Sequence, residues 1–420
     1  MMTTAGAVVT AATSARGMIP LRRLDLGSLP VAGDALPEGI KLAALRALRA
    51  TTPGWNDAKN DDNREGELMA GFSMRALTGG MTNAVFRCSK RGGENQTVLL
   101  RSYGKGTEMF FSREQELRAF KTLAERGIGP ALLATFEDGR VEQFLEGRAL
   151  GAEDMRNPTI STLIARRVSD VHKLKIDVGN RAPVVFQMLK EFHEKAVELC
   201  GGVHGGVDVV ELGTLATTLR ERLESTVVPD TVVFCHNDLQ CGNIMYDKSS
   251  YSVKGSPDDT SSTPFGDLAN PSSVDSSGST VSLIDYEYSG YNPRGFDLGN
   301  HFCEWMADYA AAEPHVLDLE RYPSPDERRR FCRTYLGAMS GVAEDEPSAD
   351  EVETLVAEAD AFSLASHLLW AMWALLQTKT GDAPPGFDYL GYAAERIRAY
   401  RHFSELFLPP ASPAKYCILV

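Results

Sequence analysis

The chain has few residues of the kinds from which zinc sites, disulfide scaffolds and nucleic-acid surfaces are built. Its seven cysteines are scattered over 420 residues, with no Cys-x-x-Cys pair at zinc-binding spacing. The 43 basic residues are outnumbered by 57 acidic ones, and the net charge of −14 disfavours nucleic acid or anionic lipid as a partner. We therefore expect free thiols in the cytoplasm and no nucleic-acid partner. The charge suits either simple solubility or the attraction of a small cation.

Long hydrophobic runs are absent as well. No apolar run reaches the length of about 18 residues that a membrane-spanning helix needs, so we expect no stable membrane insertion. Residues 1–35 begin with an Ala-, Thr- and Ser-rich stretch, and we expect this segment to be disordered, with a targeting peptide as the alternative. Residues 248–280 are rich in Ser, Asp, Pro and Thr and have almost nothing to bury, which predicts a disordered insertion.

Helical spacing of apolar residues predicts the main helices. They are expected over residues 37–50, 112–126, 157–173, 191–200, 211–223, 296–310 and 361–379. His172 lies at the end of the third helix, where we interpret it as a cap near the last carbonyls and assign it no chemistry.

Two short motifs carry the strongest chemical signal. The first is Phe234-Cys-His-Asn-Asp-Leu-Gln-Cys-Gly-Asn243, and the second begins Leu283-Ile-Asp-Tyr-Glu287. In kinases an Asp accepts the proton of the acceptor hydroxyl, while an Asn five residues later and a second, strand-borne Asp hold Mg²⁺. The predicted catalytic residues are Asp238, the base, and Asn243 and Asp285, the metal ligands, with Glu287 close by as a further ligand.

Both motifs resemble the two signatures of the choline/ethanolamine kinase family. The second continues as Leu283-Ile-Asp-Tyr-Glu-Tyr-Ser-Gly-Tyr-Asn-Pro-Arg-Gly-Phe-Asp-Leu-Gly-Asn-His-Phe-Cys-Glu-Trp305, and the likeness runs from about residue 77 to about residue 407. The resemblance implies an α+β, protein-kinase-like fold of two lobes. A β-rich nucleotide-binding lobe is expected over residues 36–145 and a mainly helical catalytic lobe over 146–410, followed by a tail over 411–420.

The resemblance also implies the reaction, in which ATP, as its Mg²⁺ complex, phosphorylates choline in the first step of the CDP-choline route to phosphatidylcholine. Ethanolamine is the alternative acceptor: Leu390-Gly-Tyr-Ala393 looks more like the ethanolamine branch, while Phe302-Cys-Glu-Trp-Met306 and Leu145-Glu-Gly-Arg148 look more like the choline branch. An aminoglycoside kinase and a non-catalytic nucleotide-binding scaffold are the remaining alternatives. The oligomeric state stays open, with a homodimer as one alternative.

Candidate nucleotide ligands lie mostly in the first lobe. A loop between two predicted strands, Thr78-Gly-Gly-Met-Thr-Asn-Ala84, allows backbone N–H groups to approach phosphate, although a plain hairpin has the same pattern. Arg101 stands where the family places its phosphate-binding Arg, and Glu116 is its expected ion-pair partner, with Arg113 or solvent as the alternative for Glu116. Residues 140–148 resemble the hinge that receives adenine. The full set is Thr78, Gly79, Gly80, Met81, Thr82, Asn83, Ala84, Arg101, Glu116, Glu142, Gln143, Arg148, Gln240 and Asp285.

Aromatic residues gather in the second lobe, which holds three of the four tryptophans. A quaternary ammonium cannot donate hydrogen bonds, so it is bound by aromatic faces and a carboxylate. Tryptophans at helical spacing are more often core residues, and the motifs upstream are what favour a cation pocket here. The candidate acceptor-binding residues are Tyr288, Glu304, Trp305, Tyr309, Trp370, Trp373, Phe387 and Tyr392.

Overall fold

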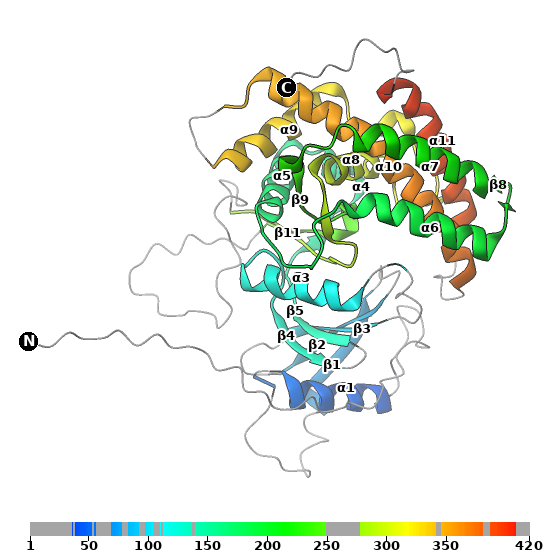
Figure 1. Ribbon diagram of the computed structural model, residues 1–420. Coiled ribbons are helices and arrows are strands. Elements are labelled where there is room, and N and C mark those ends of the chain that lie inside the picture. The colour runs from blue at the N-terminus through cyan, green and yellow to red at the C-terminus, as the bar shows by residue number, and fades with distance from the viewer. Residues whose placement is uncertain are drawn as a thin grey trace, which may run out of the picture.

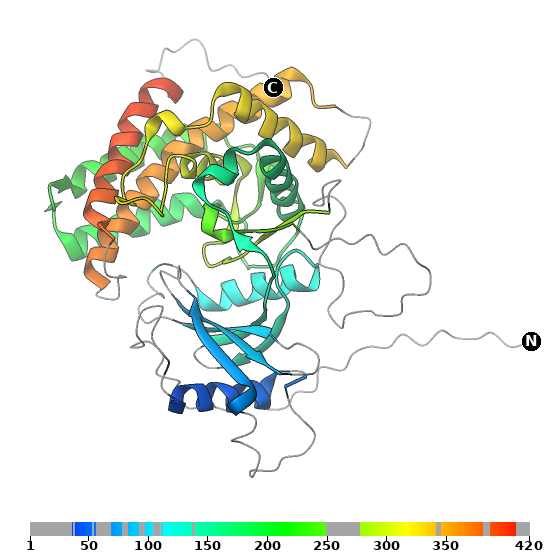
Figure 2. The same cartoon turned by 180° about the vertical axis from the view of Figure 1, so that it is seen from behind.

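The computed structural model describes residues 36, 38–52, 54–55, 69–77, 83–91, 97–103, 110, 112–136, 139–248, 278–341, 346–380 and 387–408. In this part of the chain, a smaller lobe built on a sheet lies against a larger, mostly helical lobe (Figures 1 and 2). The glycine loop at 78–82, residues 1–35, the insertion from 249 to 277 and the tail at 411–420 lie outside the described residues.

The smaller lobe is an antiparallel sheet with one helix on each face. Its strands are β1 (Phe72–Leu77), β2 (Asn83–Lys90), β3 (Thr97–Tyr103), β4 (Leu132–Phe136) and β5 (Gly139–Gln143), in the order β1-β2-β3-β5-β4. Helix α1 (Glu38–Thr51) packs its buried leucines against one face, around Trp55. Helix α3 (Arg113–Glu125) lies between the sheet and the larger lobe, with its N-terminus capped by the Ser112 hydroxyl (Figure 1). Both helices were predicted within two residues of their bounds.

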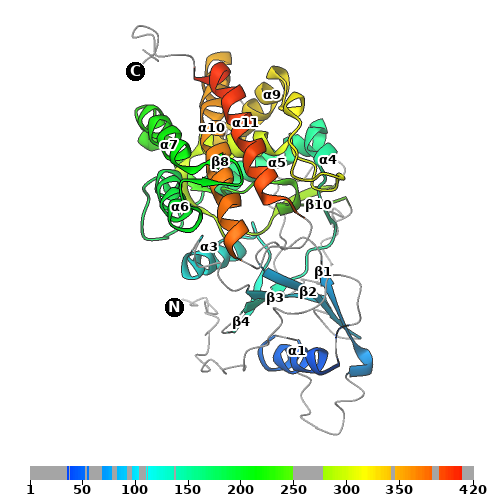
Figure 3. The same cartoon turned by 90° about the vertical axis from the view of Figure 1, so that its right-hand side faces the viewer.

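The larger lobe surrounds one long buried helix, α10 (Ala349–Thr380). Around it lie α4 (Ala152–Arg156), α5 (Pro158–His172), α6 (Val184–Cys200), α7 (Val209–Glu224), α8 (Arg294–Glu304), α9 (Pro325–Ser340) and α11 (Tyr389–Phe407), and Figure 3 shows α11 running alongside α10. α10 is long and apolar enough to cross a membrane, which the sequence analysis did not anticipate, but 94% of its most apolar stretch is buried inside the protein. Its contacts with α8, α11 and α6 explain that apolarity as the core of the lobe.

Two pairs of short strands bring the sequence motifs together. Strand β9 (Val232–Cys235) pairs with β12 (Gly290–Pro293), and β10 (Ile244–Asp247) pairs with β11 (Thr280–Leu283) and β6 (Arg148–Ala149). The loop at 236–243 joins β9 to β10, and the loop at 284–289 joins β11 to β12. Since both ends of each loop are fixed in paired strands, the two loops must lie side by side. A further hairpin, β7 (Val203–His204) with β8 (Val207–Asp208), joins α6 to α7.

Three predicted helices have different bounds in the structure. The helix expected over 191–200 begins earlier, at Val184. The helix expected over 296–310 ends at Glu304, because Ala307 forms a bridge with Leu317 and turns the chain back. The helix expected over 361–379 begins earlier, at Ala349, where the Ser348 hydroxyl accepts a hydrogen bond from Glu351 N. Its first turns are acidic but carry a buried apolar stripe at helical spacing, Val352, Leu355, Val356 and Ala359, which the prediction missed.

Candidate active site

The loop between β9 and β10 holds Asp238 and Asn243 in contact. The Asn243 amide nitrogen donates to the Asp238 carbonyl at 2.9 Å and to Asp238 Oδ2 at 2.8 Å. Because the amide turns its NH₂ group toward Asp238, its oxygen faces the other way. Burial, followed by the charges of Glu304 and Asp285, raises the pKa of Asp238 to about 8. The sequence prediction thus paired two residues that the structure does bring together.

Helix α8 holds the loop at 236–243, the candidate catalytic loop, by hydrogen bonds. Asp297 accepts hydrogen bonds from the backbone nitrogens of His236 at 2.8 Å and Asn237 at 2.7 Å, while His301 Nδ1 donates to the Leu239 carbonyl at 3.0 Å. Asn237 has φ of 68°, so these bonds hold a left-handed conformation that a non-glycine residue rarely adopts. Positions 297, 301 and 304 are four and three residues apart, so one helix face holds the loop and also presents Glu304.

His172 is a part of this network that the sequence analysis interpreted wrongly. Its side chain does not cap α5 but points inward, with Nε2 2.9 Å from Asp297 Oδ2 and Nδ1 2.8 Å from Tyr335 Oη. Burial alone would raise the pKa of Asp297, but hydrogen bonding to His172 and the nearby charges lower it below its ordinary value. Asp297 therefore stays an acceptor for the loop. A buried Asp and a buried His in otherwise apolar helical patterns were the signal available in the sequence.

The second loop carries Asp285, which faces the smaller lobe. Arg101 Nη1, at the end of β3, lies 3.2 Å from Asp285 Oδ1, and Arg101 Nε donates to Glu142 Oε1 at 2.9 Å. Asp285 also has a left-handed backbone, with φ of 66°. Burial would raise the pKa of Asp285, but the charge of Arg101, followed by that of Arg140, lowers it below the ordinary value.

The predicted ion pair between Arg101 and Glu116 is wrong. Glu116 bonds instead to Arg140 Nη1 at 2.7 Å and to Arg113 Nη1 at 2.8 Å, which was the alternative for this residue. Arg101 and Arg140 are direct neighbours across β3 and β5, and Glu142 stands two residues from Arg140 on the same face. Glu142 therefore reaches both arginines, with Arg140 Nε at 2.6 Å, and takes the place expected for Glu116.

Glu287 lies close to Asp285 and touches the smaller lobe, with its Oε2 3.3 Å from Asn83 Nδ2. Burial and the charges of Asp285 and Glu116 raise the pKa of Glu287 well above its ordinary range. Burial is the first cause of the raised pKa at both Glu287 and Asp238, and the neighbouring carboxylates add to it. Carboxylate and amide oxygens are the ligands that Mg²⁺ prefers, so the residues present fit this ion.

The aromatic residues form a continuous wall on α10 and α11. The Trp370 and Trp373 rings meet edge to face at 5.6 Å, Tyr288 meets Trp370 at 5.2 Å, and Trp373 meets Tyr389 at 5.8 Å. Phe387 joins Tyr389 at 4.9 Å and Tyr392 at 5.5 Å. Tyr389 was missed in the sequence analysis, although it lies three residues before Tyr392 and so shares its helix face.

Hydrogen bonds fix the two indoles of this wall. Trp370 Nε1 donates to Asn300 Oδ1 at 2.8 Å, and Trp373 Nε1 donates to the Tyr288 hydroxyl at 2.9 Å. Asn300 comes from the same α8 helix that holds the catalytic loop. The orientation of the wall and the position of the loop that holds Asp238 therefore depend on one element.

Two of the predicted acceptor residues differ in their surroundings. Tyr309 donates to Glu304 Oε2 at 2.8 Å, and its side chain is partly exposed. Trp305 was placed in the wall by prediction, but its indole donates to His301 Nε2 at 3.2 Å, and its ring stacks with the Arg156 guanidinium at 5.1 Å. Among the described residues, no ring contact joins Trp305 to Trp370 or Trp373. Trp305 is the residue after Glu304, so its side chain points in a different direction and away from the proposed pocket.

Several predicted nucleotide ligands have polar atoms bonded within the protein. Gln240 accepts a hydrogen bond from Gly242 N at 3.1 Å, and Gln143 accepts one from Ala131 N at 3.1 Å. Arg148 forms a two-bond pair with Asp154, at 2.6 and 2.7 Å. Ala84 lies in β2 opposite Ser102 of β3. The side chains of Gln143 and Arg148 are thus used in structure, and the backbone of β5 is paired with β3 and β4. Residues 144–147, between β5 and β6, lie outside the paired strands.

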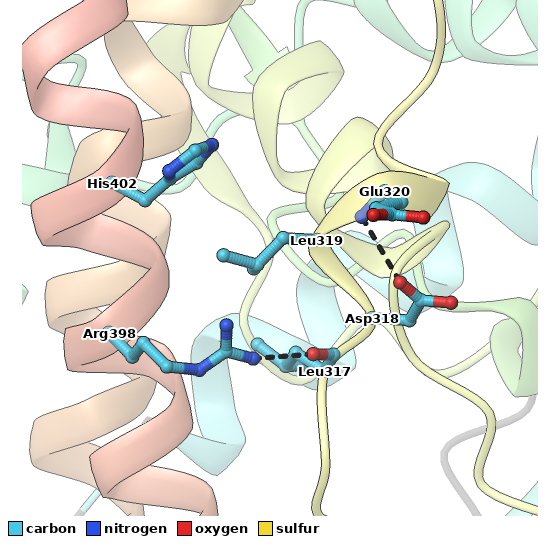
Figure 4. Close-up of a pocket in the computed structure, with 6 residues that line it drawn as sticks. All are labelled: Leu317, Asp318, Leu319, Glu320, Arg398 and His402. Carbon is cyan, nitrogen blue, oxygen red and sulfur yellow. Dashed lines mark hydrogen bonds between the residues drawn. The ribbon is translucent and has the colours of Figure 1, made fainter.

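A separate hollow of about 510 Å³ lies on the outer side of α11. It is lined by Leu317, Asp318, Leu319, Glu320, Arg398 and His402 (Figure 4). None of the predicted site residues lines it. Arg398 bonds to the Leu317 carbonyl across it, so α11 holds the chain segment that follows Tyr309.

Comparison with known proteins shows the family of this chain. The family Choline/ethanolamine kinase matches residues 74–401. A probable choline kinase 3 from Arabidopsis thaliana is 33% identical over 364 residues, 84% of this chain and 91% of the relative. A human choline/ethanolamine kinase is 33% identical over 338 residues, 77% of this chain and 78% of the relative.

Similarity to a solved structure establishes the fold. The crystal structure of choline kinase from Cryptosporidium parvum Iowa II has a TM-score of 0.68, 22% identity, and coverage of 86% of this chain and 95% of that one. The predicted α+β, protein-kinase-like fold of two lobes is confirmed. With the family match spanning most of its length and relatives sharing a third of its residues, the chain belongs to the choline/ethanolamine kinase family.

Proposed function

We propose that this protein transfers the γ-phosphate of ATP to the hydroxyl of choline, as the first step of the CDP-choline route to phosphatidylcholine. The observation that carries the proposal is that Glu304 and the aromatic wall are tied to the loop that holds Asp238. Asn237, the neighbour of Asp238, donates from its side chain to the Tyr288 carbonyl at 2.9 Å. Its backbone nitrogen donates to Asp297 on α8, the helix that ends in Glu304. After burial, the charge of Glu304 also raises the pKa of Asp238. A cation bound at Glu304 and the wall would bring a hydroxyl two carbons away toward Asp238.

Asp238 is proposed as the group that accepts the hydroxyl proton. Its hydrogen bonds from Asn243 and the hold of Asp297 on the neighbouring backbone keep its carboxylate in one orientation. Such orientation matters because proton transfer and in-line attack both depend on the position of the nucleophile. Asp297 and His172 are proposed as positioning residues, since they act through the loop.

Asp285, Asn243 and Glu287 would hold Mg²⁺, which when bound neutralises charge on the phosphates during transfer. Arg101 would meet the phosphates directly, and its planar fork of donors suits phosphate oxygens. Glu142 orients the Arg101 guanidinium by accepting a hydrogen bond from its Nε. The glycine loop at 78–84 and the backbone of 140–148 remain the proposed contacts for phosphate and adenine.

Ethanolamine is the second candidate acceptor. Its support is Glu304, whose charge suits any small cation, together with the human relative, which is named for both amines. The aromatic wall favours choline, since aromatic faces recognise quaternary ammonium ions. We further propose a cytoplasmic location, because the described cysteines are free thiols. The homodimer stays a prediction.

A direct acceptor screen tests the proposal. Purified protein is incubated with ATP and Mg²⁺, and ADP formation is measured with choline, ethanolamine, an aminoglycoside or no acceptor. ADP and phosphocholine formed together, with the highest kcat/KM for choline, are the expected outcome. ADP release that depends on an aminoglycoside alone, or that needs no acceptor, contradicts the assignment.

A further inference from the structure

The carboxylate of Glu304 is enclosed by donors from the protein itself. Tyr309 Oη donates to Oε2 at 2.8 Å, and Arg396 Nη2 donates to Oε1. Glu304 is 3% exposed and Arg396 is fully buried. Each oxygen of the predicted cation-binding carboxylate therefore already accepts one strong hydrogen bond before any substrate arrives.

Arg396 is an unusual partner for a substrate-binding carboxylate. Its Nη2 also donates to Tyr392 Oη at 2.5 Å, and its guanidinium lies 4.9 Å from the centre of the Tyr392 ring. In the part of the chain that the structure describes, Nε and Nη1 of Arg396 have no hydrogen-bond partner. Burying a guanidinium with unused donors is unfavourable, and two apolar residues would fill this space more stably. The pair therefore points to a function rather than to stability alone.

The two donors change what Glu304 can offer to a cation. A carboxylate keeps its charge when it accepts hydrogen bonds, but it has fewer lone pairs left for a ligand. Choline has no N–H group and loses nothing by this, because charge and aromatic faces suffice for it. The ammonium of ethanolamine has three N–H donors, and it must find acceptors that replace its water.

We infer that Arg396 and Tyr309 are specificity-determining residues, which favour a quaternary over a primary ammonium by occupying both oxygens of Glu304. The inference rests on the proposed function and adds the means by which this pocket separates the two amines. Arg396 acts through Glu304 and is a positioning residue.

Helix α11 holds both donors to Glu304, Arg396 and Tyr309, in place. It carries Tyr392 and Arg396 four residues apart on its inner face, and on its outer face Arg398 donates to the Leu317 carbonyl at 2.6 Å (Figure 4). Glu395 accepts from Leu317 N at 3.1 Å, so the same helix fixes the end of the segment that bears Tyr309. The enclosure of Glu304 is thus built from one helix and the chain segment tied to it.

The test is Tyr309→Phe in the full chain, which removes one hydroxyl and keeps the ring. We expect the ratio of kcat/KM for choline to that for ethanolamine to fall roughly three- to tenfold, about the effect of one hydrogen bond gained by the ammonium. The change should come mainly from a lower KM for ethanolamine. Tyr400→Phe, on α11 and outside the wall, is the matched control and should leave the ratio unchanged.

A double-mutant cycle separates this role from a structural one. In a Glu304→Gln background, Tyr309→Phe should no longer shift the ratio, because the carboxylate through which the hydroxyl acts is gone. Arg396→Met is made in the same Glu304→Gln background so that no buried charge is left alone, and there it too should leave the ratio as it is in Glu304→Gln alone. An unchanged ratio in Tyr309→Phe, or an equal shift in both backgrounds, overturns the inference. Failure of the wild-type protein to phosphorylate either amine instead overturns the proposed function.

Discussion

The two sides of the proposed active site handle charge in opposite ways. On the proposed phosphate side, Arg101, Arg113 and Arg140 interlock with Glu116 and Glu142, and every partner lies within 3.0 Å of another. On the proposed acceptor side, one carboxylate and one guanidinium stand among aromatic rings. Phosphate groups need many fixed, directional donors, whereas a quaternary ammonium needs polarisable surface and little hydrogen bonding.

The difference also explains what each side requires of the helices behind it. Strand neighbours fix the phosphate side, since Arg101 and Arg140 are paired in register across β3 and β5. The acceptor side depends on α8, whose one face holds Asp297 under the catalytic loop, Asn300 on Trp370 and Glu304 in the pocket. Loss of α8 would therefore affect the base and the pocket together, while the arginine cluster would survive.

The first prediction removes Asp238, the group that the phosphate side and the acceptor side share. Asp238→Ala should lower kcat by at least about 10²-fold, because no other described carboxylate is held by Asn243 beside the pocket. KM for ATP should change little, since Arg101 and Asp285 are untouched. Steady-state kinetics with choline, together with a thermal unfolding curve to confirm the fold, checks this. Near-normal turnover in the variant contradicts the assignment of the base.

The chemistry of this residue was predictable from sequence because its motif is local. Asp238 and Asn243 are five residues apart, and Asp285 lies at the end of a recognisable strand. Contacts that join distant segments were not predictable in the same way. Nothing local indicates that Glu142 rather than Glu116 binds Arg101, since that depends on the register of β3 with β5. Arg396, 92 residues from Glu304 along the chain, was missed for the same reason.

The second prediction disrupts the cluster of arginines and glutamates on the phosphate side at Arg140, which is not a proposed nucleotide ligand. Arg140→Ala leaves Glu116 and Glu142 buried with one partner fewer each, and should lower the free energy of unfolding by about 3–5 kcal/mol. Chemical denaturation measures the loss. Arg148→Ala is the control, because its pair with Asp154 is largely exposed and should contribute less than about 1 kcal/mol. Equal losses in the two variants would show that the buried cluster is not what holds the smaller lobe together.

The third prediction weakens the acceptor side alone. Trp373→Leu should lower kcat/KM for choline about tenfold, because one aromatic face is worth about 1–2 kcal/mol to a bound quaternary ammonium. Ethanolamine should lose less, and KM for ATP should stay within about twofold because the phosphate side is separate. Trp305→Leu removes an equally buried indole outside the wall and serves as the control. If Trp305→Leu hurts choline as much as Trp373→Leu, the wall is core packing and the cation pocket lies elsewhere.

The smallest effect is expected from the outer face of α11. Arg398→Ala removes the hydrogen bond to the Leu317 carbonyl and loosens the segment that bears Tyr309, while Arg396 keeps its contact with Glu304. An exposed contact of this kind contributes about 0–1 kcal/mol, so the ratio of kcat/KM for choline to that for ethanolamine should fall by less than about threefold, with kcat unchanged. The change should appear as a lower KM for ethanolamine, because the hydroxyl of Tyr309 would hold Glu304 less often. Arg401 lies further along α11 and forms an exposed ion pair with Glu211 of α7. Arg401→Ala breaks that pair, and as the matched control it should leave KM unchanged. If Arg398→Ala lowers kcat or alters KM for ATP instead, α11 acts on the phosphate side too, and the two sides are less independent than their contacts indicate.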